Sequence, residues 1–504
     1  MRVVVRVDGD PRIGGGHVMR CLTLADALRE RGAAVAFVTT DAPGGLASKI
    51  EAAGFGVHRL PVAAHVPPPA PPHAAWCRVP RDVDAAATGG IVRDRRADWL
   101  IWDHYGLDAE WVAGVRASNP GLRVLALDDL DDRPLASDMV LDQTRLEGVR
   151  VHPALSALAG PAHALLRPEF ATLRPAALAR RADAALHTIA VHPGMMDAAG
   201  LAPAALDALA DHPARVEVAM GSAAQSVAAT RARTAPPNRC LVLDAPDMAA
   251  RMAAADLCVG AAGMTAWERA CLGLPTVTVA VADNQRAVVA ALAEAGAVVP
   301  LSLEAARDPA RLRDAVAAAW ADRAALSARA AALCDGRGAA RVAAALSGRL
   351  RPLVQADAAT MLAWRNAPKV VAATPSARPV DPQGHPAWLA RQLASGARWR
   401  VWVEDGRDRG IVGAQPGEGW TWSFYAAPDA PRGAGHRMCA AFLREIAEAD
   451  AAPVHAVVRA DNPASIRLHE RLGFSRVPSA DPALLAFRRL TWDIARDLRL
   501  PEAP

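Results

Sequence analysis

The chain has 504 residues with 57 basic and 53 acidic side chains, so its formal net charge of +4 is close to balanced. No basic block alternates with aromatic residues, which argues against nucleic acid as a partner. The seven cysteines are scattered without C-x-x-C pairs, which argues against a disulfide framework and a zinc site and favours a reducing compartment.

Hydrophobic residues make up 52% of the chain, enough for globular cores, and this length predicts two to four domains. The N-terminal stretch lacks the apolar core of a signal peptide, and no apolar run approaches the ~20 residues that a membrane span needs. The sequence therefore predicts a soluble, cytoplasmic protein without a membrane span.

The first strand-and-helix unit contains a glycine-rich turn. Val3–Val7 is typical of a buried strand, and apolar residues in Val18–Leu28 recur at helical spacing. Between them lie Gly14–Gly16 and His17, at the carboxyl end of a strand, where parallel sheets bind ligands. Glycines let the backbone approach a substrate, and a histidine exchanges protons near neutral pH. By itself this turn supports two interpretations equally: a histidine that acts on a bound ligand, and a histidine that only caps the helix.

Four more apolar runs before residue 165 predict strands that alternate with helical patterns, as in a parallel α/β domain. They are residues 33–38, 99–102, 122–127 and 139–141. The proline-rich stretch 61–80 is predicted to be a surface loop. Tyr105 follows a strand end, where we expect it within reach of the His17 cleft. Packing under a loop is a nearly equal interpretation of this tyrosine.

A second α/β series follows residues 167–174, which break the pattern and are predicted to be a connector. Its strands are predicted at residues 187–191, 216–220, 240–243, 256–259 and 276–281. The small-residue loop Gly260–Gly263 leads to Thr265, which is predicted to open a helix whose free N–H groups suit a diphosphate. Glu268, one turn later, suits ribose hydroxyls. Ordinary capping is the alternative, but loop, helix and glutamate together favour a nucleotide site.

Six collinear motifs within residues 1–348 resemble one enzyme family. They are Gly-Gly-His-Val-Met-Arg-Cys-Leu-Thr-Leu-Ala at 15–25, Asp-His-Tyr at 103–105, Leu-Asp-Asp-Leu at 127–130, Leu-Leu-Arg-Pro-Glu-Phe at 165–170, Thr-Ala-Trp-Glu-Arg at 265–269 and Cys-Asp-Gly-Arg-Gly-Ala at 334–339. The family is the UDP-2,4-diacetamido-2,4,6-trideoxy-β-L-altropyranose hydrolase of pseudaminic acid synthesis. The resemblance implies a GT-B fold, a UDP-linked amino sugar as substrate and water attack at the anomeric carbon without a metal.

The resemblance also implies roles for individual residues. His17 matches the catalytic histidine of the family and Tyr105 its active-site tyrosine. The residues predicted to bind substrate are Gly15, Gly16, Arg20, Gly263, Met264, Thr265, Glu268, Asn284 and Gln285. The chain departs from the family at residues 192–197, which read His-Pro-Gly-Met-Met-Asp where a Gly-Gly-Thr-Asp-like loop is usual.

Residues 352–490 resemble a GNAT acetyltransferase of the same pathway. The resemblance rests on Trp-Arg-Asn at 364–366, on the loop 432–437 before a predicted helix, and on Asn-Pro-Ala-Ser-Ile-Arg-Leu-His-Glu-Arg-Leu-Gly-Phe at 462–474. It implies acetyl-CoA as co-substrate, bound by Arg432, Gly433, Gly435, Asn462 and Ser465. His469 stands where many members carry a general-acid tyrosine. Proton donation by His469 and simple packing on the cofactor are equally supported.

The predicted fold class is α/β: a GT-B-like pair of Rossmann-type domains, residues 1–165 and 166–348, followed by a GNAT domain, residues 349–504. The predicted function is bifunctional, with hydrolysis of the UDP-diacetamido sugar by the N-terminal half and acetylation of the precursor's 4-amino group by the C-terminal half. Two alternatives stay open: a GT-B glycosyltransferase with an accessory acetyltransferase domain, and a non-catalytic sugar-nucleotide-binding module.

Overall fold

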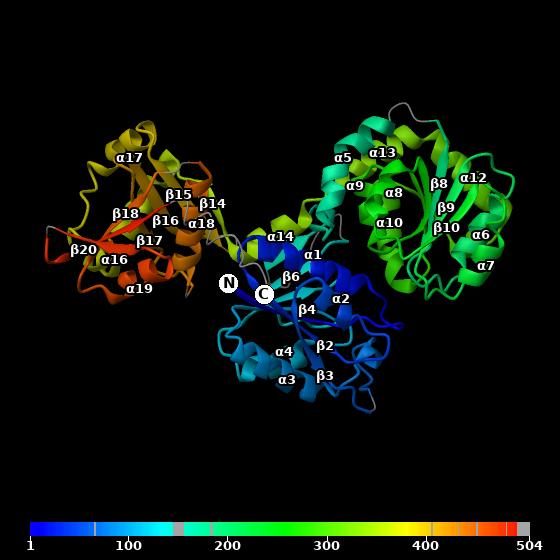
Figure 1. Ribbon diagram of the computed structural model, residues 1–504, viewed down its shortest axis with the longest axis horizontal. Coiled ribbons are helices and arrows are strands. Elements are labelled where there is room, and N and C mark those ends of the chain that lie inside the picture. The colour runs from blue at the N-terminus through cyan, green and yellow to red at the C-terminus, as the bar shows by residue number, and fades with distance from the viewer. Residues whose placement is uncertain are drawn as a thin grey trace. The chain divides into compact units, whose positions relative to one another are not determined.

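The computed structural model describes residues 1–64, 67–144, 156–181, 185–404, 407–431, 433–449, 452–479 and 481–490. These residues form three sheets, each flanked by helices (Figure 1). By its internal contacts the chain divides into two units, residues 2–342 and residues 343–504 with Met1. Two parallel sheets belong to the first unit and one mixed sheet to the second. The predicted α/β class, with two Rossmann-type domains followed by a third α/β domain, is confirmed.

The first sheet is parallel throughout, in the order β3-β2-β1-β4-β5-β6-β7. Its strands are β1 (Arg2–Val7), β2 (Ala34–Thr40), β3 (Gly56–Leu60), β4 (Trp99–Asp103), β5 (Arg123–Leu127), β6 (Met139–Asp142) and β7 (Ser156–Ala159). Its helices are α1 (Gly16–Glu30), α2 (Ala47–Ala52), α3 (Arg81–Asp94) and α4 (Ala109–Ala117), with 3-10 turns η1 (Ala74–Trp76) and η2 (Pro161–His163). Helices α1 and α2 lie on the opposite side of the sheet from α3 and α4 (Figure 1).

The second sheet is also parallel, in the order β10-β9-β8-β11-β12-β13. Its strands are β8 (Thr188–His192), β9 (Arg215–Met220), β10 (Arg239–Leu243), β11 (Leu257–Ala261), β12 (Thr276–Val279) and β13 (Val299–Leu301). One face packs against α6 (Leu201–Ala208) and α12 (Pro309–Ala321), the other against α5 (Pro168–Arg181), α8 (Met248–Ala254), α9 (Thr265–Cys271) and α10 (Arg286–Glu294). The other elements between β8 and β14 in the chain are α7 (Val227–Ala232), η3 (Asp283–Gln285), α11 (Leu303–Ala306), α13 (Arg323–Leu333) and α14 (Gly338–Ser347).

The C-terminal sheet has the order β14-β15-β16-β17-β18-β20-β19, and its described pairs are antiparallel except β17 with β18. Its strands are β14 (Arg349–Pro352), β15 (Arg398–Glu404), β16 (Arg407–Pro416), β17 (Trp420–Ala426), β18 (Val454–Arg459), β19 (Ser475–Val477) and β20 (Leu484–Arg489). Its helices are α15 (Ala358–Arg365), α16 (Pro368–Ala373), α17 (His385–Ala394), α18 (Ala434–Ala449) and α19 (Pro463–Arg471), with η4 (Gln355–Asp357). The amphipathic α18 buries Met438, Phe442 and Ile446 against this sheet.

Two predictions about connecting segments need correction. Residues 167–174, expected to be a connector, lie mostly in α5, which continues to Arg181 and includes Pro175. Arg174 fixes this helix by donating to the carbonyls of Cys271, Ala331 and Cys334. The described part of the proline-rich stretch 61–80 is not only a surface loop, because it contains η1 and buries Ala74, Cys77 and Val79.

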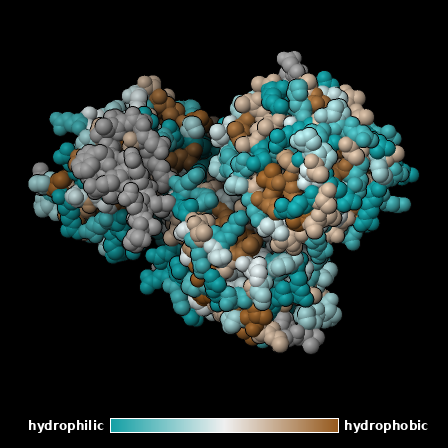
Figure 2. All heavy atoms as spheres, turned by 45° about the vertical axis from the view of Figure 1, so that its right-hand side comes forward, coloured by the Kyte–Doolittle hydropathy of each residue, from teal (hydrophilic) through white to brown (hydrophobic). Residues whose placement is uncertain are grey.

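Hydrophilic residues cover much of the face shown in Figure 2. In the described part of the chain, the large hydrophobic side chains that remain exposed come from separate elements and segments. They are Val62, Val83, Met195, Val354, Leu393 and Val457. No helix in the described ranges is long and apolar enough to cross a membrane.

Candidate functional site

His17 and Asp103 meet at the carboxyl edge of the first sheet. Asp103 is the last residue of β4, and His17 is the second residue of α1. Strands β1 and β4 pair in parallel with Val7 opposite Asp103, so the turn after β1 places α1 beside the end of β4. Nδ1 of His17 lies 2.5 Å from Oδ1 of Asp103. The exposed fractions of the two side chains are 11% and 0%, so water has little access to this bond.

The surroundings of Asp103 keep it ionised. Burial opposes its ionisation, but Arg20 and His17 outweigh burial and hold the pKa of Asp103 well below its usual value. Arg20 donates from Nε at 2.6 Å and from Nη2 at 2.7 Å. A carboxylate beside Nδ1 assigns the ring proton of neutral His17 to that atom and leaves the lone pair on Nε2. Among the described residues none hydrogen-bonds to Nε2, so this atom is available to a water molecule or a substrate hydroxyl.

Arg20, predicted to contact substrate, is buried and paired with two carboxylates. Its side chain is only 4% exposed and pairs with Asp103 on one side and with Asp129 on the other. The burial and pairing of the guanidinium leave little of it for a ligand. We therefore assign Arg20 as a positioning residue that holds the Asp103 carboxylate against His17.

Tyr105 forms a wall beside His17. Its ring packs edge-on against the imidazole with 4.7 Å between centroids. Its hydroxyl donates to Oδ2 of Asp129 at 2.9 Å, and burial raises the pKa of the phenol, so it keeps its proton at neutral pH. Trp76 of η1 stacks on Tyr105 with 5.5 Å between centroids and 25° between planes. No sequence motif pointed to Trp76, because it lies in the proline-rich stretch.

A buried ion-pair network lies next to this site. Arg6 of β1 pairs with Asp8 and with Asp84 of α3, at 2.7 Å in each case, and is 1% exposed. His104 accepts a backbone N–H at Nδ1, which leaves its Nε2 facing Asp8 at 3.3 Å. This network fixes the backbone on the N-terminal side of Tyr105. The sequence did not predict this network, because Asp84 and His104 are far from Arg6 and Asp8 in the chain.

In the second domain, the turn between β11 and α9 leaves an open backbone surface. A Cβ atom built at Gly263 would meet nothing within 4 Å. Met264 is the N-cap of α9, and Thr265 is its first residue, as predicted from the sequence pattern. Oγ1 of Thr265 accepts a hydrogen bond of 3.1 Å from Nη1 of Arg269, which is 1% exposed. A helix start with a cation beneath it suits an anionic group.

Glu268 is a carboxylate in an unfavourable environment. Its side chain is 15% exposed, and the nearest cation, Arg167, lies 3.8 Å away. Burial raises the pKa of Glu268 to about 7, and Arg167 offsets only part of that effect. A buried acid that titrates near neutral pH is a functional-site candidate, because a ligand that donates hydrogen bonds would relieve its desolvation.

The turn after β12 contains the last two predicted substrate residues. Gln285 uses Oε1 to accept the backbone N–H of Val281 at 3.0 Å, so this side chain closes the turn after β12. The side chain of Asn284 lies outside the described residues. The structure therefore gives Gln285 a structural role, and substrate binding by Asn284 stays a prediction.

Within the unit of residues 2–342, the two glycine-rich turns lie near each other. Gln143, which follows β6, donates to Sδ of Met264 at 2.8 Å. A Cβ atom built at Gly16 would lie 4.0 Å from Cγ of Met264, and one at Gly15 would lie 3.0 Å from Sδ of Met195. The turn before His17 thus faces the turn before α9.

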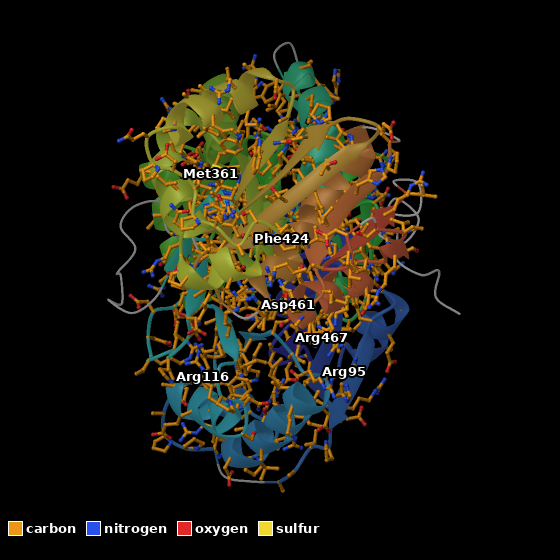
Figure 3. The ribbon with its side chains drawn as sticks, turned by 90° about the vertical axis from the view of Figure 1, so that its left-hand side faces the viewer. Arg95, Arg116, Met361, Phe424, Asp461 and Arg467 are labelled. Atoms are coloured by element: carbon orange, nitrogen blue, oxygen red, sulfur yellow. The ribbon has the colours of Figure 1, made fainter. Side chains whose placement is uncertain are left out.

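The C-terminal sheet opens between two of its strands. Strands β17 and β18 pair only at Trp420 with Val454 and at Thr421 with His455. Beyond these pairs, β17 runs on to Ala426 and β18 to Arg459 without further pairing to each other. Figure 3 labels Phe424 on β17 and Asp461, which follows β18. Unpaired strand edges offer N–H and C=O groups to an extended ligand.

Helix α18 begins at the loop predicted to bind pyrophosphate. Arg432 lies outside the described residues. Gly433 has a positive φ of 84°, and a Cβ atom at Gly435 would meet nothing within 4 Å. Arg437, the large residue at the last small position of the motif, pairs with the buried Glu404 at 2.7 Å. Its side chain is directed inward, so the outer face of the loop keeps its glycine surface.

His469 does not have the surroundings of a general acid. It is 2% exposed, its Nδ1 lies 2.8 Å from the carbonyl of Ser465, and its Nε2 accepts from Nε1 of Trp422 at 3.2 Å. Both ring nitrogens are therefore engaged, and burial lowers its pKa. Asn462 caps α19 by accepting the N–H of Ser465 at 3.1 Å. These contacts favour the packing interpretation of His469 over proton donation.

Comparison with known proteins identifies the C-terminal domain. Residues 349–475 match the family model of the acetyltransferase (GNAT) domain. Among solved structures, MurG of Acinetobacter baumannii is 17% identical, with 68% of this chain and 98% of that chain covered at a TM-score of 0.49. A ribosomal-protein-alanine N-acetyltransferase of Brucella melitensis is 23% identical, with 28% of this chain and 99% of that chain covered at a TM-score of 0.25.

A spinosyn rhamnosyltransferase, SpnG, is 19% identical, with 68% of this chain and 98% of that chain covered at a TM-score of 0.46. No curated protein matches the chain. In the described ranges, no group of three or more His, Cys, Asp or Glu side chains is arranged to hold a metal ion. The C-terminal part of the chain is thus a GNAT acetyltransferase domain, and a GT-B-like pair of Rossmann-type domains precedes it.

Proposed function

We propose that the chain is a bifunctional enzyme of pseudaminic acid synthesis. Its C-terminal domain acetylates the 4-amino group of a UDP-linked amino sugar with acetyl-CoA. Its N-terminal domains then hydrolyse UDP from the resulting UDP-2,4-diacetamido-2,4,6-trideoxy-β-L-altrose. The observation that carries the hydrolase assignment is the pair of His17 with an ionised Asp103, which leaves Nε2 of the histidine as a free proton acceptor.

Hydrolysis needs a base for water and a stabiliser for the departing diphosphate. Nε2 of His17 takes a proton from water as its oxygen bonds to the anomeric carbon. The bond from that carbon to the diphosphate oxygen breaks, and its electron pair leaves with UDP. Asp103 stabilises the imidazolium that forms, and Arg20 holds Asp103 in place. Tyr105 limits the rotation of the imidazole.

The second domain supplies the nucleotide contacts in this proposal. The N–H groups at the start of α9, from Gly263 to Thr265, bind the diphosphate, and the buried Arg269 adds positive charge beneath them. Glu268 accepts hydrogen bonds from the ribose hydroxyls. This contact favours the ionised carboxylate, which burial otherwise disfavours.

The GNAT domain fits acetyl-CoA through two features of its backbone. The divergence of β17 and β18 leaves strand edges for an extended chain, and the glycines before and within the first turn of α18 leave space for a pyrophosphate. Gly433 and Gly435 are the described residues that would hold it. Acetyl-CoA supplies the activated acetyl group that the sugar amine accepts.

The test is incubation of the full chain with the UDP-4-amino sugar and acetyl-CoA, with UDP and free thiol measured together. We expect thiol release to depend on the amino sugar and UDP release to follow acetylation. A glycosyltransferase would release UDP only when a sugar acceptor is added. A binding module would release neither product. Either result would contradict the proposal.

A further inference from the structure

The proline-rich segment is tied to the first domain at several points near its second half. Sγ of Cys77 donates to the carbonyl of Gly106 at 3.3 Å, and Arg78 pairs with the buried Asp10. Arg12, in the loop before α1, donates to the carbonyl of Ala75 at 3.4 Å. These contacts fix η1 beside the turn that carries His17.

Two aromatic side chains of this segment complete a ring cluster at His17. Trp76 lies edge-on to His17 with 5.8 Å between centroids and lies nearly parallel to Tyr105. His73 packs on both Trp76, at 4.9 Å, and Tyr105, at 5.7 Å. Burial lowers the pKa of His73, which favours the neutral form of its ring. The cluster is therefore an apolar surface beside the proton-accepting nitrogen of His17.

Trp76 is only partly covered by this packing. Trp76 and His73 are both half-buried, and among the described residues none accepts a hydrogen bond from Nε1 of Trp76. A partly exposed indole offers a large flat apolar surface and one N–H donor at its edge. The C–H face of a hexose packs on such a surface, and the hydroxyl or acetamido oxygens at its rim accept from N–H.

We propose that Trp76 and His73 form the sugar subsite of the first domain, on which the hexose ring of the nucleotide sugar stacks. The inference rests on the proposed function for the identity of that sugar. The location of the cluster favours the sugar over the uracil base. His17 must act at the anomeric carbon, so the group beside His17 is the ring that contains this carbon. The nucleotide binds through α9 of the second domain in the same proposal.

The experiment compares the affinities of UDP and of the UDP-diacetamido sugar by calorimetry, in a His17→Asn background that prevents turnover. Trp76→Ala should bind the UDP-sugar about tenfold more weakly, as expected for loss of an aromatic contact, with unchanged affinity for UDP. Trp76→Phe, which keeps a ring, should stay within a few-fold of the parent. His73→Ala should show a smaller loss of the same selective kind.

Equal weakening of UDP and the UDP-sugar would show that Trp76 contacts the nucleotide or supports the fold, and would overturn the subsite. No weakening of either ligand would overturn it as well. Circular dichroism and thermal unfolding of each variant check that its N-terminal unit is folded. Because binding requires no turnover, the two proposals can fail separately. A wild type that releases no UDP would contradict the hydrolase, whereas the selective loss in Trp76→Ala would leave the subsite standing.

Discussion

Nδ1 of His17 and Oδ1 of Asp103 are 2.5 Å apart and buried at the carboxyl edge of the first sheet. This pair fixes which nitrogen of the imidazole carries the proton and leaves Nε2 for chemistry. Arg20 supports this pair, because its guanidinium, together with His17, outweighs the effect of burial and favours the ionised carboxylate of Asp103. The chemistry proposed for the N-terminal half follows from these three side chains.

Replacing Asp103 with Asn should test whether this carboxylate sets the tautomer of His17. The amide presents an N–H to Nδ1, which moves the imidazole proton to Nε2 and removes the base. We expect hydrolysis to fall by about 10²–10⁴-fold, the range for loss of a general base, with UDP affinity unchanged. Arg20 would lose one of its two partners, so denaturation should also show a loss of about 3–5 kcal/mol. Hydrolysis within a few-fold of wild type would contradict the role of Asp103.

Glu268 should make stability depend on pH. Its folded-state pKa of about 7 lies above the ordinary value of 4.5, so the folded protein holds this proton more tightly than the unfolded chain. The carboxylate therefore destabilises the fold increasingly as the pH rises from about 4.5 to about 7. We expect Glu268→Gln to be more stable than wild type at pH 8 by up to about 3 kcal/mol. Urea titrations should show this difference narrowing toward pH 5, and a difference independent of pH would contradict the assignment.

The carboxylate of Glu268 should also contribute to the affinity for UDP. Glu268→Ala should weaken UDP binding by about 1.5–3 kcal/mol, the value of a charge-assisted hydrogen bond, without abolishing hydrolysis at saturating substrate. Calorimetric titration with UDP measures this loss. Glu169, on α5, is the matched control, because Glu169→Ala removes a neighbouring acid that pairs with the same Arg167 at 3.0 Å. Unchanged UDP affinity in Glu268→Ala would remove the ribose contact from the account.

We expect His469 to have a structural role in the C-terminal domain and no catalytic one. His469→Phe keeps a ring of similar shape within the cluster formed with Trp422, Phe474 and Phe487, but leaves Nε1 of Trp422 without its acceptor. We expect a stability loss of about 1–3 kcal/mol for that unsatisfied donor and acetyl transfer within a few-fold of wild type. A rate loss of about 10²-fold or more in a folded variant would restore the general-acid role.

Acetyl transfer and hydrolysis should be separable at Gly435. Gly435→Glu places a carboxylate where the pyrophosphate of acetyl-CoA is proposed to bind, and charge repulsion should abolish acetyl transfer. Gly435→Ala is the matched control, because its Cβ meets nothing within 4 Å. Hydrolysis of a preformed diacetamido substrate should persist in both variants. A joint loss of both activities in Gly435→Glu would show that the two activities are not independent.

The sequence predicted much of the frame, because hydrophobic runs and glycine turns are local signals. The start of α9 at Thr265 and the position of His17 at the start of α1 are examples. Partners that depend on strand pairing were not predictable in this way. Asp103 reaches His17 only because β1 and β4 pair in register, and Trp76 reaches it through a proline-rich stretch without periodicity. The packing role of His469 depends on Trp422 of a separate strand.

The central claim is that water, activated by His17, attacks the anomeric carbon. The most direct test is incubation of the full chain with the UDP-diacetamido sugar in ¹⁸O-labelled water, without any acceptor. We expect UDP release with label in the C1 hydroxyl of the sugar at the earliest times and none in UDP. His17→Asn should slow this release by about 10²–10⁴-fold while binding UDP and acetylating normally. Label in UDP, no release without an acceptor, or near-normal hydrolysis by His17→Asn would contradict the account.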